Sequence, residues 1–147
     1  MTQSHENFMK IALQEAQKAF SKDEIPIGAV VVVDNKIIAK GHNQTEALQD
    51  ATAHAEMIAL TAAFNSLGAK YLMNASIYVS VEPCVMCAGA LYWSKIKKVI
   101  YGTSDQKYGF SQKCNHSILH PKTEIISGIL AEESSQIMQD FFKLKRN

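Results

Sequence analysis

The feature that most constrains this 147-residue chain is a set of metal-ligand residues in two short stretches, His54-Ala55-Glu56 and Pro83-Cys84-Val85-Met86-Cys87. Catalytic zinc takes three protein ligands and leaves its fourth tetrahedral position to a water molecule, whose pKa falls to about 7. His54, Cys84 and Cys87 supply three such ligands. The Cys-x-x-Cys spacing lets both sulfurs reach one ion from the first turn of a helix, where the helix dipole favours thiolate. We therefore predict a catalytic zinc site with these three ligands.

Glu56 stands two residues after His54, so we expect its carboxylate beside the metal water rather than on the ion. There it could take a proton from that water and return it to the substrate as a general acid and base. Parts of the pattern have other interpretations, because Cys-x-x-Cys alone is also typical of a redox pair and His-x-Glu of a helix surface. A structural zinc would need a fourth ligand, for which Cys114 is the remaining thiol.

Composition predicts one domain, residues 1–147, with a substantial core. The net charge of +1 gives no global indication of nucleic acid, so any RNA contact must be local. No apolar run is long enough to cross a bilayer, and the polar stretch 1–6 has no features of a secretory signal. Three cysteines, two of them predicted to bind metal, provide no disulfide framework. We therefore expect a soluble protein of the reducing cytoplasm that binds no membrane.

Hydrophobic periodicity predicts helices and strands that alternate around a sheet. The expected helices cover 8–20, 53–64, 84–93 and 131–145, and the expected strands cover 27–33, 36–42, 75–81, 97–102 and 123–127. The first two strands should form an antiparallel hairpin, and the fourth should run parallel to the third because a helix connects them. Thr52 is the expected cap of the second helix. Both metal stretches then open helices beside one sheet, which indicates an α/β fold.

Several other residues have two interpretations. Asn43 follows the second strand and is either a turn residue or a side chain directed into a cleft. The irregular segment 103–121 is either disordered or a functional loop. Phe141 and Phe142 could serve packing or recognition, and the basic end of the last helix could simply complement the helix dipole. Basic residues that could instead form a local surface beside a pocket are Lys95, Lys97, Lys98, Lys107, Lys143, Lys145 and Arg146.

The two metal stretches match the H-x-E…P-C-x-x-C pattern of zinc nucleobase deaminases. Nearly the whole chain resembles the bacterial tRNA-specific adenosine deaminases, through residues 25–30, 52–56, 81–90, 128–130 and 141–142. This resemblance implies a three-layer α/β/α sandwich with a central mixed five-stranded sheet, similar to cytidine deaminase. It also implies a homodimer with one zinc ion per subunit that converts adenosine to inosine at the wobble position of a tRNA anticodon. The zinc ligands and the proton-carrying glutamate are those predicted above.

The resemblance further implies substrate contacts at Asn43, Asp105, Lys107 and Phe142. Asn43 falls on an asparagine that hydrogen-bonds the flipped base, and Phe142 falls on an aromatic residue near the nucleotide pocket. Asp105 and Lys107 fall on residues that contact sugars and phosphates of the anticodon loop. Such single-stranded loops are what proteins read in RNA, through splayed and stacked bases. The chain departs from the family's Gly- and Ser-rich pattern at 108–114, which leaves the RNA contacts of that segment open.

Two alternative functions remain. Tyr92-Trp93 is similar to the related guanine deaminases, which act on a free base, although the pair could equally be an apolar patch on a dimer-forming helix. The first alternative is therefore a deaminase of a free base or nucleoside such as guanine or cytosine. The second is a zinc-stabilised binding module without catalysis. Glu56 argues against the binding module, because a structural site has no use for that carboxylate.

Overall fold

The computed structural model describes residues 4–113 and 118–146, and its centre is a five-stranded sheet of order β2-β1-β3-β4-β5. The strands are β1 (Gly28–Val33), β2 (Lys36–His42), β3 (Ala75–Val81), β4 (Lys98–Thr103) and β5 (Glu124–Ile126). β1 runs antiparallel to β2 and β3, whereas β4 is parallel to both β3 and β5. The predicted mixed sheet is confirmed. As a consequence, the C-terminal ends of β2, β3 and β4 lie at the same end of the sheet.

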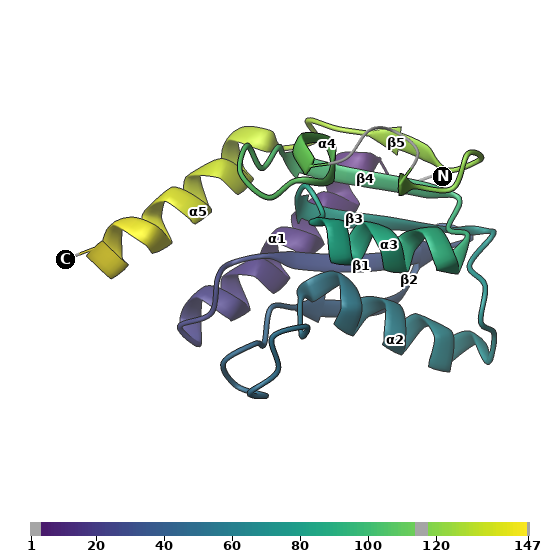
Figure 1. Ribbon diagram of the computed structural model, residues 1–147, viewed down its shortest axis with the longest axis horizontal. Coiled ribbons are helices and arrows are strands. Elements are labelled where there is room, and N and C mark those ends of the chain that lie inside the picture. The colour runs from purple at the N-terminus through teal and green to yellow at the C-terminus, as the bar shows by residue number, and fades with distance from the viewer. Residues whose placement is uncertain (1–3, 114–117, 147) are drawn as a thin grey trace.

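Helices cover both faces of this sheet (Figure 1). α2 (Ala55–Leu67) and α3 (Val85–Ser94) lie on one face, and α1 (His5–Ser21) and α5 (Ala131–Arg146) lie on the other. α4 (Phe110–Lys113) is a short helix after β4, and α5 extends beyond the sheet towards the C-terminus. The predicted three-layer α/β/α sandwich is therefore confirmed. Among the residues that the structure describes, no helix is both long and apolar enough to cross a membrane.

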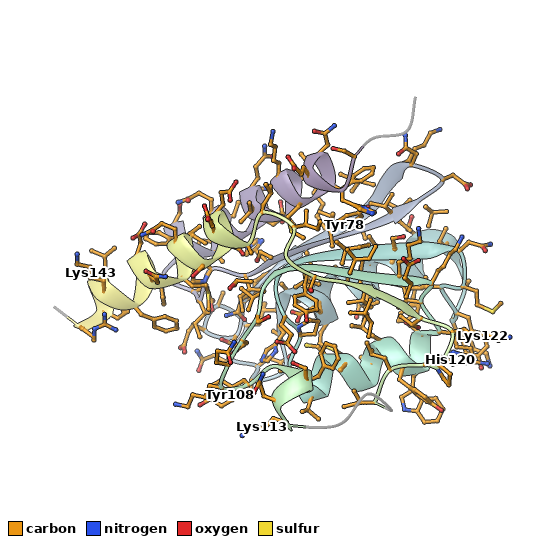
Figure 2. The ribbon with its side chains drawn as sticks, turned by 90° about the horizontal axis from the view of Figure 1, so that it is seen from above. Tyr78, Tyr108, Lys113, His120, Lys122 and Lys143 are labelled. Carbon is orange, nitrogen blue, oxygen red and sulfur yellow. The ribbon has the colours of Figure 1, made fainter. Side chains whose placement is uncertain are left out.

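Alternation along the central strands separates two hydrophobic cores. Val31 and Ile77 are paired across β1 and β3 and belong to the core beneath α2 and α3. Their neighbours Val30 and Tyr78 are also paired and belong to the core beneath α1. Figure 2 shows Tyr78 on the α1 side of the sheet. Successive side chains of a strand point to opposite faces of the sheet. Both helical layers therefore pack against the same central strands.

The start of α2 lies against the end of β2 because residue 41 is a glycine. A Cβ atom at Gly41 would lie 2.6 Å from the carbonyl oxygen of Ala55 and 2.8 Å from the amide nitrogen of Ala59. Ala55 and Ala59 are fully buried, so small residues permit the approach from both sides. This contact brings His54 and Glu56 to the end of the sheet at which β2 and β3 finish.

The prediction that Thr52 caps α2 is wrong. The helix begins at Ala55 with His54 as its N-cap residue, and the Thr52 hydroxyl donates to Asp50 at 2.7 Å. Cys84 is likewise the N-cap residue of α3 rather than its first helical residue. Neither His54 nor Cys84 makes a side-chain capping hydrogen bond. Both cap positions are therefore occupied by side chains that point to each other instead of to their own helix.

Candidate metal centre and cleft

Two N-cap residues and the first turn of α3 form a cluster of possible metal ligands. The Nδ1 atom of His54 lies 3.6 Å from the Sγ of Cys84 and 3.5 Å from the Sγ of Cys87. All three ligand atoms lie within 4.8 Å of one another. Zn–N and Zn–S bonds that meet at a tetrahedral angle place nitrogen and sulfur about 3.5 Å apart. The spacing therefore fits one tetrahedral zinc ion. Cys114, considered as a fourth ligand, lies outside the described residues.

The protonation of the two thiols depends on their mutual contact. A hydrogen bond from Cys87 lowers the pKa of Cys84 to about 4, with help from His54 and against the effect of burial. The same hydrogen bond, together with burial, raises the pKa of Cys87. Hydrogen bonding to Cys84 also raises the pKa of His54. Two adjacent thiolates repel each other unless a cation lies between them. A donor set of two sulfurs and one imidazole suits zinc, and these residues would hold the ion with both cysteines as thiolates.

Glu56 lies beside this cluster in the first turn of α2. Its side chain is buried, with 4% of the residue exposed, and it lines a cleft shared with His54 and Cys84. Burial raises the pKa of Glu56 to about 7. A carboxyl group with such a pKa can both accept and donate a proton near neutral pH. The structure therefore places a candidate proton carrier next to the metal ligands.

Asn43 directly follows β2 and is also buried in the wall of the cleft. Its backbone N–H donates to the carbonyl oxygen of Ile27 at 3.1 Å. Its side-chain oxygen Oδ1 has no hydrogen-bond partner among the described residues. Leaving a buried acceptor unpaired costs about 1–3 kcal/mol. As a turn residue alone, Asn43 would bear this cost with nothing to offset it, whereas in the cleft its oxygen can pair with an N–H group of a bound base. The cost therefore favours the interpretation of Asn43 as a side chain directed into the cleft.

The cleft has a volume of about 1380 Å³ and extends from the metal ligands to the loop after β4 and to α5. The four substrate-contact residues implied by the resemblance all line it: Asn43, Asp105, Lys107 and Phe142. The two phenylalanines of α5 have different surroundings. Phe141 packs edge-on against Phe20, with ring centroids 5.7 Å apart, whereas Phe142 is 39% exposed in the cleft wall. One is therefore a packing residue and the other faces the cleft.

Of the seven basic residues that could form a local surface beside a pocket, three lie at the cleft. Lys107, Lys143 and Arg146 line the cleft. Lys145 does not, and it forms an ion pair with Asp23 in the turn after α1. Three other lysines lie at or just before the start of β4, at the opposite end of the strands from the cleft: Lys95, Lys97 and Lys98. Local cationic charge at the cleft therefore comes from Lys107 and Lys113 after β4 and from Lys143 and Arg146 of α5.

Comparison with known proteins now identifies the family. Residues 2–103, which include all three candidate ligands, match the family model described as the cytidine and deoxycytidylate deaminase zinc-binding region. The chain belongs to this deaminase family. A tRNA-specific adenosine deaminase of Rickettsia felis is 45% identical to it over 92% of this chain and 98% of the relative. The resemblance predicted from the sequence is confirmed.

Two solved structures are informative neighbours of this deaminase. One comes from a study of A-to-I editing by tRNA:A34 deaminases at the wobble position of transfer RNA; it is 39% identical with a TM-score of 0.83, over 89% of this chain and 98% of that chain. The other is a guanine deaminase from Bacillus subtilis, 37% identical with a TM-score of 0.67, over 80% of this chain and 72% of that chain. The first neighbour therefore matches this deaminase over more of both chains.

Sequence reasoning missed the carboxylate that holds residues 105–111, which form the outer wall of the cleft. Glu82 is 3% exposed and accepts the backbone N–H groups of Asp105 at 3.1 Å and of Ser111 at 3.0 Å. It also accepts the Ser111 hydroxyl at 2.6 Å. A Cβ atom at Gly109 would lie 2.3 Å from the Oε1 of Glu82. Residues 105–111 are therefore an ordered loop. The sequence signal for Glu82 was its place between a buried strand and a proline, because a buried carboxylate needs hydrogen-bond partners.

Tyr92 and Trp93 lie on α3 of the deaminase with their rings edge to face, 5.4 Å apart. Trp93 is 74% exposed. Neither residue is among the described residues that line the cleft. The pair therefore does not shape the candidate base pocket, and its exposure fits a contact surface.

Proposed function

We propose that this protein is a zinc-dependent hydrolase that converts adenosine to inosine at the wobble position of a tRNA anticodon. The observation that carries the proposal is the form of the cleft. Possible zinc ligands and the buried Glu56 lie at its base, and its volume of about 1380 Å³ exceeds the roughly 300–1,000 Å³ typical of small-molecule sites. Such a cleft suits one base inserted from a longer RNA chain. Near full-length similarity to tRNA-specific adenosine deaminases supports the same substrate.

His54, Cys84 and Cys87 would hold one zinc ion per subunit, and when bound this ion supplies a water molecule whose pKa is near 7. Glu56 is the proton carrier of the proposed reaction. Its carboxylate takes a proton from water and passes it to the substrate. A C–O bond forms at C6 of adenine, the C6–N bond breaks, and ammonia leaves, so one water is consumed for each inosine formed. The raised pKa of Glu56, about 7, suits both halves of this transfer.

The remaining contacts orient the RNA. The unpartnered Oδ1 of Asn43 accepts an N–H group of the flipped base. Asp105, Lys107 and Phe142 contact nucleotides beside that base, because they line the outer part of the same cleft. Asp105 also accepts the backbone N–H group of Lys107 at 3.0 Å, so the same carboxylate shapes the loop that bears both side chains.

We further propose that the enzyme is a homodimer of the cytoplasm. The exposed pair Tyr92 and Trp93 on α3 fits a subunit contact, because aromatic residues are enriched in interfaces. The cysteine ligands require reduced thiols, which the cytoplasm maintains. Sedimentation equilibrium should find a dimer for the wild type and a weaker one for Trp93→Ala. A wild type that is monomeric at micromolar concentration would contradict the homodimer.

Ammonia release measured on five substrates in parallel tests the function. The substrates are an anticodon stem-loop with adenosine at the wobble position, the same stem-loop with guanosine there, free adenosine, free guanine and free cytosine. We expect the first to have the highest kcat/KM by far, and sequencing of the product should show inosine at the wobble position alone. Turnover of free guanine or cytosine with no reaction on the stem-loop would replace the proposal by the free-base alternative.

A further inference from the structure

Tyr108 is an exposed aromatic residue in the wall of the cleft. Its residue is 56% exposed, and it lines the same cavity as Glu56 and Asn43. An exposed aromatic ring buries little apolar surface, so packing does not account for its position. Figure 2 shows Tyr108 and Lys113 near the lower margin of the view and Lys143 on α5 at its left end, and all three residues line the cleft.

The backbone of Tyr108 is fixed from several directions. The Oδ1 atom of Asp105 accepts the Tyr108 N–H group at 2.9 Å, and the carbonyl oxygen of Asp105 accepts the Gly109 N–H group at 3.0 Å. Gly109 forms an isolated β-bridge with Cys84, and the Phe110 N–H group donates to the carbonyl oxygen of Pro83 at 2.9 Å. The loop is thus attached to the residue that precedes the metal-ligand helix. A ring on so constrained a backbone loses little conformational entropy when a partner stacks on it.

Cationic side chains lie next to this ring. The Nζ atom of Lys107 is 5.2 Å from the centroid of the Tyr108 ring. Lys113, at the end of α4, lines the cleft on the same side. An exposed aromatic ring with neighbouring cations is the arrangement that binds single-stranded nucleic acid, since bases stack on the ring and phosphates approach the cations. Stacking is worth roughly 5- to 150-fold in affinity per base.

We propose that Tyr108 is a stacking platform for the nucleobase next to the target adenosine, with Lys107 and Lys113 neutralising the phosphates on either side of that base. This inference rests on the proposed function. The target base must reach Glu56 at the base of the cleft, so its neighbours along the chain lie at the outer wall, where Tyr108 presents its ring. Tyr108 therefore contributes to RNA affinity, and this contribution requires the neighbouring base to be present. It acts on binding rather than on proton transfer.

The test combines substitution of Tyr108 with removal of the neighbouring base. Kd and single-turnover rates are measured for wild type, Tyr108→Ala and Tyr108→Phe on the anticodon stem-loop, and on stem-loops abasic at the position before or after the target. We expect Tyr108→Ala to bind the intact stem-loop roughly 5- to 150-fold more weakly and Tyr108→Phe to bind within about threefold of wild type. On one of the two abasic RNAs the difference between wild type and Tyr108→Ala should vanish.

Tyr71→Ala is the matched control, because Tyr71 is also exposed and lies 4.4 Å from the Nζ of Lys95, but on a part of the surface outside the cleft lining. It should bind RNA as wild type does. The platform would be overturned if Tyr108→Ala bound the intact stem-loop with wild-type affinity, or if its loss of affinity on both abasic RNAs equalled its loss on the intact stem-loop. In either case, turnover of the stem-loop by the wild type would keep the proposed function. A wild type that acts on free guanine alone would overturn both.

Discussion

The metal centre and the outer wall of the cleft are stabilised in different ways. The metal centre stands on the N-cap positions of two helices that pack closely on the sheet, as at Gly41. The outer wall, residues 105–111, depends largely on one buried carboxylate, that of Glu82. The proposed chemistry therefore resides in a part secured by many packed contacts, and the proposed recognition of RNA resides in a part secured by a few hydrogen bonds. Damage to the first should stop the reaction, and damage to the second should weaken RNA binding while the metal stays bound.

The largest effect is expected at Glu56. Glu56→Gln keeps the size and burial of the side chain but removes its ability to carry a proton. The single-turnover rate of inosine formation should fall by about 10²- to 10⁴-fold, which is the usual contribution of general acid and base catalysis. Zinc content, measured by atomic emission, and stem-loop affinity should stay at wild-type values, because the ligands and the outer wall are untouched.

The control is Glu46→Gln, since Glu46 is an exposed glutamate outside the cleft lining. Its rate should equal that of the wild type. A Glu56→Gln variant that retains its zinc and reacts within tenfold of the wild type would remove Glu56 from the proposed mechanism.

How much the sequence predicts follows the same division. The ligand set and the strands were predictable because coordination chemistry restricts residue types and because burial alternates along a strand. The α2 cap was not, since the local preference for Thr52 was overridden by a contact between His54 and Cys84, thirty positions apart. The burial of Glu82 could have been predicted from its place between a buried strand and a proline, but its partners could not, because they lie 23 and 29 positions away. Non-local hydrogen bonds leave no periodic pattern in a sequence.

An intermediate effect is expected at Glu82. Both carboxylate oxygens accept hydrogen bonds, so the amide of Glu82→Gln must direct an NH₂ group at the donor of Asp105 or of Ser111. We expect a loss of about 1–3 kcal/mol in the free energy of unfolding, measured by urea denaturation. Amide hydrogen exchange at Asp105 and Ser111 should accelerate, and stem-loop affinity should fall, while zinc content does not change.

Glu24→Gln provides the matched comparison. Glu24 is 2% exposed and accepts the N–H groups of Glu46 at 3.1 Å and of Ala47 at 2.7 Å, so it holds a different loop by the same means. It should lose a similar unfolding free energy and leave exchange at Asp105 and Ser111 as in the wild type. Wild-type exchange at these two amides in Glu82→Gln would show that the outer wall does not depend on this carboxylate.

The smallest effect separates two lysines of α5. Lys143 lines the cleft, whereas Lys145 is paired with Asp23 and its Nζ lies 5.6 Å from the ring centroid of Phe141. A cation that neutralises one phosphate of a single strand contributes about 0.7 to the slope of log Kd against log salt concentration. Lys143→Ala should reduce the slope by about this amount and weaken stem-loop binding several-fold at low salt. Lys145→Ala removes the same charge from the chain but should leave the slope unchanged, because the side chain is paired with Asp23 and is not part of the cleft lining. Equal slopes in the two variants would mean that net charge, rather than position on the cleft wall, governs the approach of RNA.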